Sequence, residues 1–356
     1  MELFQLAKPA IFMLPPELAH TASILALKSG AIRPPLCSKD KRLNVSVGGI
    51  VFPNPLGLAA GYDKNAEVPD AILNLGFGFA EVGTVTPKAQ GGNPKPRIFR
   101  VLRDKGLINR LGFNNEGHDA AKSRLEARRS KHGVVGVNIG ANKDSDDFIA
   151  DYEKGIDAFY DLATYFTANI SSPNTPGLRN LQTGEALEVL LARIFDRVHE
   201  NQLRTNFAVP VFLKIAPDLS ESEIREIADV VRKSELSALI VSNTTVDRAM
   251  LSDRSFDNEA GGLSGRPVFE KSTHVLASMY RELGDAMPLI GAGGIMSVED
   301  AITKIGAGAS LIQLYSGMVF EGPGLPARIV NGLSRFLDQN HNKSISELVG
   351  IENDKW

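Results

Sequence analysis

The chain has 356 residues, and its 43% hydrophobic and 23% charged content is that of a folded protein with a sizeable core rather than a disordered or fibrous one. Its net charge of −3 gives no electrostatic basis for binding nucleic acid. The single cysteine, Cys37, excludes an internal disulfide framework and a cysteine-rich metal site. The length fits either two ordinary domains or one long α/β barrel.

The amino-terminal segment, residues 3–32, is rich in Leu, Ile, Phe, Met and Ala and carries few charges. It does not resemble a secretory signal, because Glu2 comes first and prolines interrupt the apolar residues. Proline in a first turn predicts two short helices, over residues 9–14 and 16–28, with Gly30 as a stop. The second helix has an apolar face that either packs on the protein's own core or lies in a membrane interface. No apolar run reaches the about 18 residues of a transmembrane helix.

Short apolar runs then recur along the chain, most of them followed by a polar loop and a helical pattern. After the fifth run, for example, Ser220 and Glu223 form a capping-box signature ahead of apolar residues at helical spacing. Repeated strand and helix predict parallel strands, and eight such units close a (β/α)8 TIM barrel, here over residues 40–340, with residues 341–356 as a C-terminal tail. The eight runs are residues 56–60, 79–82, 134–138, 165–170, 211–215, 238–242, 289–292 and 310–314.

A doubly wound open sheet is the alternative fold. It normally carries Gly-x-Gly-x-x-Gly after its first strand, whereas the first strand here ends in Gly57-Leu-Ala-Ala-Gly-Tyr-Asp-Lys.

The carboxyl ends of the eight runs carry polar residues or glycine, which a barrel does not need there for its own stability. Because these ends meet on one face of a barrel, we expect them to form a ligand site. Turn residues alone would also explain the stretch Ala-Asn-Ile-Ser-Ser-Pro-Asn-Thr-Pro-Gly at residues 168–177, where Pro173 and Pro176 end the strand. The residues at the eight ends are Ala60, Gly61, Asp63 and Lys64; Gly83 and Thr84; Asn138; Asn169, Ser172 and Asn174; Lys214; Ser242, Asn243 and Thr244; Gly291, Gly293 and Gly294; Tyr315 and Ser316.

The residue types indicate the ligand. Glycines after the seventh run and Ser316 after the eighth suit a phosphate, although a glycine-rich turn is often only a turn. Several Asn side chains suit a planar ring such as a pyrimidine or a flavin. Lys64 and Lys214 supply positive charge, unless they are solvated loop residues. The six histidines are scattered, so we expect no bound metal.

Ordered motifs over nearly the whole chain resemble those of the class 2, quinone-linked dihydroorotate dehydrogenases. The resemblance implies a barrel that binds FMN, oxidises dihydroorotate to orotate in pyrimidine synthesis and passes the electrons to a membrane quinone. The motifs are Gly57-Leu-Ala-Ala-Gly-Tyr-Asp-Lys-Asn, Glu81-Val-Gly-Thr-Val-Thr-Pro, Gly92-Asn-Pro-Lys-Pro-Arg-Ile-Phe-Arg, Ile108-Asn-Arg-Leu-Gly-Phe-Asn, Asn169-Ile-Ser-Ser-Pro-Asn-Thr, Lys214-Ile-Ala-Pro-Asp, Ser242-Asn-Thr-Thr and Gly261-Gly-Leu-Ser-Gly.

The resemblance also assigns roles to residues. Ser172 is then the catalytic base for the C5 proton, and its being serine rather than the cysteine of soluble class 1 relatives favours class 2. Lys64 is expected to hold the substrate carboxylate. The remaining substrate residues would be Asn109, Arg110, Leu111, Gly112, Phe113, Asn169, Asn174, Asn243 and Thr244. Those for FMN would be Ala59, Ala60, Gly61, Thr84, Asn138, Asn169, Lys214, Ser242, Gly265, Gly294, Tyr315 and Ser316, and those at the quinone entrance His20, Arg100 and Tyr315.

The same resemblance implies that residues 1–32 rest on a membrane and admit the quinone. We therefore expect a monomeric peripheral protein on the cytoplasmic face of a bacterial inner membrane, with the mitochondrial inner membrane as the alternative. Three other functions stay open: a class 1-like enzyme using fumarate or NAD, a non-redox barrel for a phosphorylated metabolite, and a membrane scaffold without catalysis.

Overall fold

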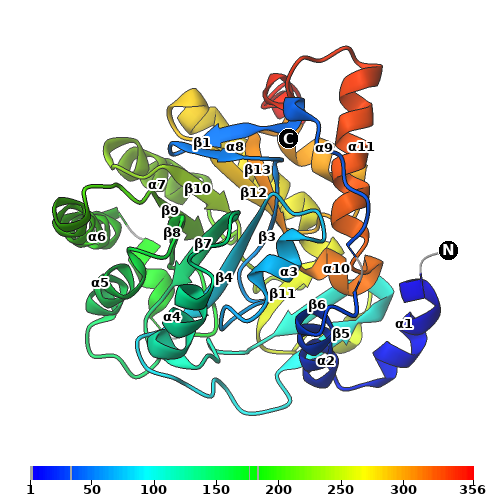
Figure 1. Ribbon diagram of the computed structural model, residues 1–356, viewed down its shortest axis with the longest axis horizontal. Helices are drawn as coiled ribbons and strands as arrows, with labels where there is room; N and C mark the ends of the chain where they lie inside the picture. Colours follow the sequence, from blue (N-terminus) through cyan, green and yellow to red (C-terminus); the bar gives the residue numbers. More distant parts are fainter. Residues whose placement is uncertain (1–2, 33, 176, 183) are drawn as a thin grey trace.

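The computed structural model describes residues 3–32, 34–175, 177–182 and 184–356, and its centre is a closed barrel of eight parallel strands (Figure 1). The predicted barrel is confirmed and the open sheet is wrong. Pro176, expected to help end the fourth strand, and residues 1 and 2 of the predicted segment 1–32 lie outside the described residues. In barrel order the strands are β3 (Leu56–Leu58), β4 (Phe79–Val85), β7 (Val134–Ile139), β8 (Tyr165–Asn169), β9 (Val211–Ile215), β10 (Ala238–Val241), β12 (Leu289–Ala292) and β13 (Ala309–Leu314).

Helices surround the barrel, and their apolar faces pack on its outer surface (Figure 1). The strands are buried along nearly their whole length, as expected for a parallel sheet covered on both faces. The Ser220 capping box forms as predicted: the Ser220 hydroxyl accepts from the Glu223 amide, and the Glu223 carboxylate accepts from the Ser220 amide. The helices are α3 (Pro69–Leu73), α4 (Gly117–Ala127), α5 (Phe148–Phe159), α6 (Gly184–Thr205), α7 (Glu221–Lys233), α8 (Phe269–Leu283), α9 (Val298–Gly306), α10 (Ser316–Glu321) and α11 (Leu325–Gln339).

Aromatic side chains fill the amino-terminal end of the barrel. Tyr165 stacks on Phe212 with ring centroids 4.4 Å apart, and Phe52 meets Phe79 edge-on at 5.0 Å. Phe52 comes from a hairpin of β1 (Val45–Val47) and β2 (Ile50–Phe52). Because this end is plugged, a ligand has access only from the carboxyl end.

A three-stranded antiparallel sheet adds a wall that the sequence reasoning did not predict. It consists of β5 (Ile98–Val101), β6 (Gly106–Asn109) and β11 (Gly262–Gly265), in the order β11-β6-β5. The sheet joins segments about 150 residues apart, for example by pairing Gly262 with Asn109. Short strands paired at such separation leave little local signal.

The amino terminus forms α1 (Leu3–Met13) and α2 (Pro16–Lys28), beside β5 and β6 (Figure 1). The predicted start of the first helix at Pro9 is wrong, because Pro9 lies inside α1. Contacts with the barrel outweigh the hydrogen bond that proline removes: Lys8 donates to the Phe320 carbonyl, and Phe12 packs on the Phe320 ring at 5.9 Å. Among the described helices, none has the length and hydropathy needed to cross a membrane.

Residues 341–356 pack against the barrel instead of extending from it. They form two short 3-10 turns, Ile345–Leu348 and Asn353–Lys355, and Ile345 and Leu348 are buried in the main core. The Asn353 side chain donates to the carbonyls of Ala277 and Ala307.

Candidate active site

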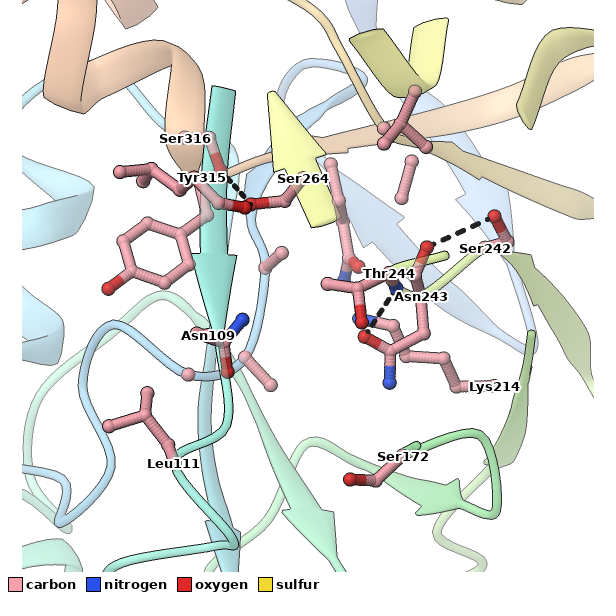
Figure 2. Close-up of a pocket in the computed structure, with 18 of the residues that line it drawn as sticks. Asn109, Leu111, Ser172, Lys214, Ser242, Asn243, Thr244, Ser264, Tyr315 and Ser316 are labelled. Atoms are coloured by element: carbon pink, nitrogen blue, oxygen red, sulfur yellow. Dashed lines mark hydrogen bonds between the residues drawn. The ribbon is translucent and has the colours of Figure 1, made fainter. Parts of the chain in front are cut away.

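A cavity opens at the carboxyl ends of the strands, and it is called the main cavity below (Figure 2). Its lining combines the barrel strand ends with the β5, β6 and β11 wall. With two exceptions, the structure brings all predicted substrate and cofactor residues to this lining. These residues are Ser172, Lys64, Asn109, Leu111, Gly112, Phe113, Asn169, Asn174, Asn243, Thr244, Ala59, Ala60, Gly61, Thr84, Lys214, Ser242, Gly265, Gly294, Tyr315 and Ser316.

The two exceptions are Asn138 and Arg110. Asn138 is fully buried behind the lining, where it bonds to Thr84. The Arg110 guanidinium turns away from the cavity, pairs with the Glu259 carboxylate and lies 4.6 Å from the centre of the Phe99 ring. A side chain held in this way does not reach a ligand in the main cavity, so the geometry gives no support to Arg110 as a substrate ligand. Local sequence could not show this, because Glu259 is about 150 residues away.

Several lining residues were missed by the sequence reasoning. Gln313 lines the cavity from near the carboxyl end of β13, and Ser264, Leu107 and Ile98 belong to the unpredicted sheet. Behind Gln313 lies the fully buried carboxylate of Glu81, which accepts from its side-chain amide at 2.8 Å. The signal that could have identified Gln313 and Glu81 is a polar residue within a buried strand, because such a side chain needs a partner in the interior.

One corner of the main cavity is built for close approach of an anion. Gly293 and Gly294 follow β12 with φ of 112° and 77°, which favours glycine. A Cβ on Gly294 would lie 2.5 Å from the Cβ of Phe269, so a larger residue would displace this turn. The Ser316 hydroxyl stands beside the corner and donates to Ser264 at 2.9 Å (Figure 2).

Ser172 points into the main cavity, which Asn109 and Leu111 border on the other side (Figure 2). It is 5% exposed, and its Oγ accepts from the Asn174 backbone amide at 3.2 Å. An N–H directed at this oxygen stabilises negative charge on it, which helps the hydroxyl give up its own proton.

The two predicted lysines differ in their electrostatic surroundings. Burial lowers the pKa of Lys214, and the negative charge of Glu81 partly offsets this. The pKa of Lys64 falls to about 8, first through burial and then through repulsion from Arg97, against the attraction of Glu17 and Asp63. Both ammonium groups are therefore poorly solvated, and an anion or an electron-rich ring would favour their charged forms.

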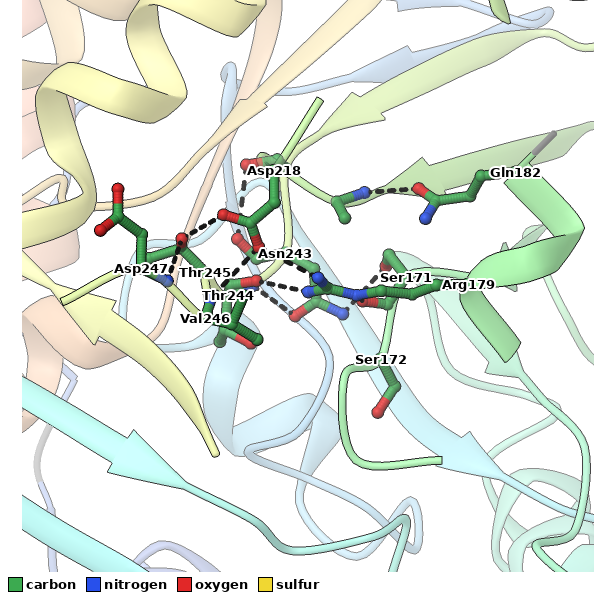
Figure 3. Close-up of polar contacts among 12 residues, drawn as sticks. Ser171, Ser172, Arg179, Gln182, Asp218, Asn243, Thr244, Thr245, Val246 and Asp247 are labelled. Atoms are coloured by element: carbon green, nitrogen blue, oxygen red, sulfur yellow. Dashed lines mark hydrogen bonds and ion pairs between the residues drawn. The ribbon is translucent and has the colours of Figure 1, made fainter. Parts of the chain in front are cut away.

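The Arg179 guanidinium ties together three loops at the carboxyl end of the barrel, two of which line the main cavity (Figure 3). It lies in the 3-10 segment Leu178–Gln182 and donates to the Ser171 carbonyl at 3.2 Å and to the Thr244 carbonyl at 3.1 Å. It also pairs with Asp218 at 3.0 Å. These loops follow β8, β9 and β10, so Arg179 fixes the loop of Ser172 against the loop that carries Asn243 and Thr244.

A second, apolar cavity of about 380 Å³ lies between the amino-terminal helices and β5 and β6, and it is called the apolar cavity below. The three residues predicted at a quinone entrance, His20, Arg100 and Tyr315, all line it. Tyr315 also lines the main cavity, so the two cavities adjoin there. Burial and the charge of Lys64 lower the pKa of His20 to about 3, which keeps this ring neutral at physiological pH.

A closed parallel barrel whose carboxyl end carries amides, two lysines and a glycine-rich corner is the framework of a (β/α)8-barrel enzyme. The family model described as dihydroorotate dehydrogenase matches residues 42–337, and the chain belongs to this family. The family is flavin-dependent and oxidises dihydroorotate in pyrimidine biosynthesis.

Curated relatives named dihydroorotate dehydrogenase (quinone) are similar over almost the full length, which corresponds to class 2. The protein from Allorhizobium ampelinum is 58% identical over 350 residues, covering 98% of this chain and 96% of the relative. One from Brucella melitensis is 56% identical over 353 residues, which cover 99% of this chain and 96% of the relative. Crystal structures of the enzyme from Eimeria tenella, ligand-free and with ferulenol, match with a TM-score of 0.90 at 38% identity. Each match covers 95% of this chain. It covers 99% of the ligand-free Eimeria chain and 95% of the chain with ferulenol.

Proposed function

We propose that dihydroorotate is oxidised to orotate in the main cavity, with FMN as the hydride acceptor and a membrane quinone as the final electron acceptor. The observation that carries this proposal is the convergence of Ser172, Lys64 and the Asn side chains on the same cavity as the glycine corner. A cysteine at position 172 would favour the class 1-like alternative with fumarate or NAD, and a non-redox barrel would not need this amide set. Family membership excludes a scaffold without catalysis.

The residues of the main cavity fit FMN chemically. Gly265, Gly294 and Ser316 would hold the phosphate, because glycine backbone amides and a hydroxyl suit an anion. Thr84 and Ser242 would bind the ring edge, Asn169 would pack beside it, and Lys214 would favour negative charge on the ring. Bound FMN supplies the hydride-accepting chemistry at its N5 atom. Ala59, Ala60, Gly61 and Tyr315 would pack on it, while Asn138 would act from behind Thr84.

Lys64 would bind the substrate carboxylate through its ammonium group, since no hydrogen bond joins that group to any residue the structure describes. The amides of Asn109, Asn169, Asn174 and Asn243, with Thr244 and the backbone of 111–113, would hold the ring. Ser172 would then remove the C5 proton as the C6 hydride leaves. A hydroxyl is a weak base, so its proton must pass to a further acceptor in the same step.

The apolar cavity would admit the quinone past His20 and Arg100 to Tyr315. Four exposed apolar side chains on the amino-terminal helices, Leu6, Met13, Leu18 and Leu25, support a peripheral contact of residues 1–32 with a membrane. We place this contact on the cytoplasmic face of a bacterial inner membrane, with the mitochondrial inner membrane as the alternative. The protein would act as a monomer and would not bind nucleic acid. It would consist of three parts: residues 1–32, the barrel at 40–340 and the C-terminal residues 341–356.

A steady-state assay tests the proposal. The purified protein is supplied with dihydroorotate and, in separate reactions, a quinone, fumarate or NAD. Extraction of FMN from the purified protein and turnover with the quinone alone are expected. A colourless protein would refute the role of FMN, and turnover with fumarate or NAD would move the protein to the class 1-like alternative.

A further inference from the structure

A chain of five side-chain hydrogen bonds runs from the main cavity into the barrel interior, and every donor in it points the same way. It begins at Asn243 and ends at the carboxylate of Glu81. The first two bonds join Asn243 Nδ2 to Ser171 Oγ and Ser171 Oγ to Asn169 Oδ1, both at 2.9 Å. Figure 3 shows the Asn243 and Ser171 side chains at this end.

The remaining three bonds continue toward the barrel floor. Asn169 Nδ2 donates to Thr84 Oγ1 at 2.9 Å, and Thr84 Oγ1 donates to Asn138 Oδ1 at 2.5 Å. Asn138 Nδ2 then donates to Glu81 Oε1 at 2.7 Å. Asn169, Thr84, Asn138 and Glu81 are all buried, so water does not compete for these groups.

Glu81 is the only carboxylate in this chain of bonds, and the side chains that contact its oxygen atoms are hydrogen-bond donors. Its Oε2 atom accepts from Tyr165 at 3.2 Å, Thr167 at 3.1 Å and Gln313 at 2.8 Å. An ionised carboxylate only accepts hydrogen bonds, whereas an amide both donates and accepts. The Asn138 amide must therefore turn its nitrogen to Glu81 and its oxygen to Thr84.

The orientation of the Asn138 amide determines the donor and the acceptor in each of the next hydrogen bonds. Because the Asn138 oxygen faces Thr84, the Thr84 hydroxyl donates toward Asn138 and accepts from the Asn169 nitrogen. The Asn169 oxygen then accepts from both the backbone amide and the hydroxyl of Ser171, which occupies its two lone pairs. Asn169 is left with one N–H to offer to the main cavity.

We propose that Glu81 is a positioning residue that, together with the Ser171 backbone amide at the other end, fixes the direction of this chain, so that Asn169 presents an N–H donor and not an acceptor to the ligand ring. The inference rests on the proposed site. It makes the main cavity complementary to a ring edge with a carbonyl oxygen, as in orotate, and unfavourable to one with a ring N–H at that place. Glu81 acts from beneath the lining and does not touch the ligand.

The test compares Glu81→Gln with Thr167→Val in the flavin-loaded protein. In the first variant, an amide replaces the carboxylate without a change of shape. Its oxygen suits the three donors at the Oε2 position, so its nitrogen faces the Asn138 nitrogen and opposes the direction of the chain. Reversal relieves this opposition only if the Ser171 backbone amide gives up its bond to the Asn169 oxygen. Thr167→Val removes one donor to the same carboxylate and leaves the chain intact.

Two quantities are measured: the dissociation constant of orotate and the infrared stretch of its carbonyl groups when bound. For Glu81→Gln we expect binding weaker by roughly 10-fold to 100-fold, the range for an unpaired buried polar group. The carbonyl band should also move to higher wavenumber, because a donor is lost. Thr167→Val should leave the band in place and change affinity by less than about 3-fold.

An unmoved carbonyl band in Glu81→Gln would overturn the proposal, and so would an equal loss of affinity in both variants, which would mean a packing role only. Thr84→Val breaks the chain at the hydroxyl and replaces Glu81→Gln if that variant does not fold. Lys64→Gln separates this inference from the proposed site. If it leaves orotate affinity unchanged, the site assignment fails; if it weakens orotate while Glu81→Gln does not, only the role of Glu81 fails.

Discussion

Substrate binding should depend on the protonation of Lys64 near pH 8. An exposed lysine stays charged well beyond this pH, but partial burial and the neighbouring Arg97 lower the Lys64 pKa to about 8. If only the ammonium form binds the substrate carboxylate, raising the pH through 8 removes the binding form from the free enzyme. The dissociation constant of orotate should then rise by about tenfold between pH 7 and pH 9 and by about tenfold for each further unit.

Titration calorimetry with orotate at several pH values measures this slope directly. Lys64→Gln should bind more weakly at pH 7 by roughly 10-fold to 100-fold, as expected for the loss of a hydrogen bond to a charged group. Its affinity should stay flat across the same range. Lys28→Gln is the matched control, because Lys28 is a surface lysine paired with Glu67 at 3.4 Å. A flat profile in the unmodified protein, or the same slope in Lys64→Gln, would refute the assignment of this titration to Lys64.

Three further outcomes are expected. Ser172→Ala should lower turnover at neutral pH by at least about 100-fold while the flavin stays bound, and a near-normal rate in stopped-flow reduction would identify another base. Deletion of residues 1–32 should spare flavin reduction by dihydroorotate and impair oxidation by long-chain quinones; equal loss in both half-reactions would mean a structural segment. Arg179→Lys should lower kcat by roughly 10-fold, because a lysine cannot span three loops, whereas Arg193→Lys at a surface pair with Glu153 should not. An equal effect of the two arginine variants on kcat would contradict the role of Arg179.

The barrel and most of the candidate site could be predicted because both follow from local patterns repeated along the chain. Apolar runs followed by helical patterns give parallel strands, and the closed barrel brings their carboxyl ends together. Lys64, Asn169, Lys214 and Gly294 therefore lie on one cavity although they are far apart in sequence. A short motif such as the Ser220 capping box is equally local, and it forms as predicted.

Side-chain direction and partner choice were decided only by the tertiary structure. Arg110 was itself predicted to bind the substrate, yet Glu259 turns its guanidinium away from the cavity. Pro9 lies inside α1 because Phe12 and Lys8 find partners on the barrel.

By itself, the sequence determined the eight strands, the polar strand ends and the motifs that mark the family, since all of these depend on neighbours in the chain. The tertiary structure decided which amide atoms face the ligand. That choice depends on a buried carboxylate, Glu81, whose partners Thr167 and Gln313 come from other strands of the barrel. Hydrogen-bond direction is a property of the whole network of donors and acceptors, and only the folded barrel assembles that network.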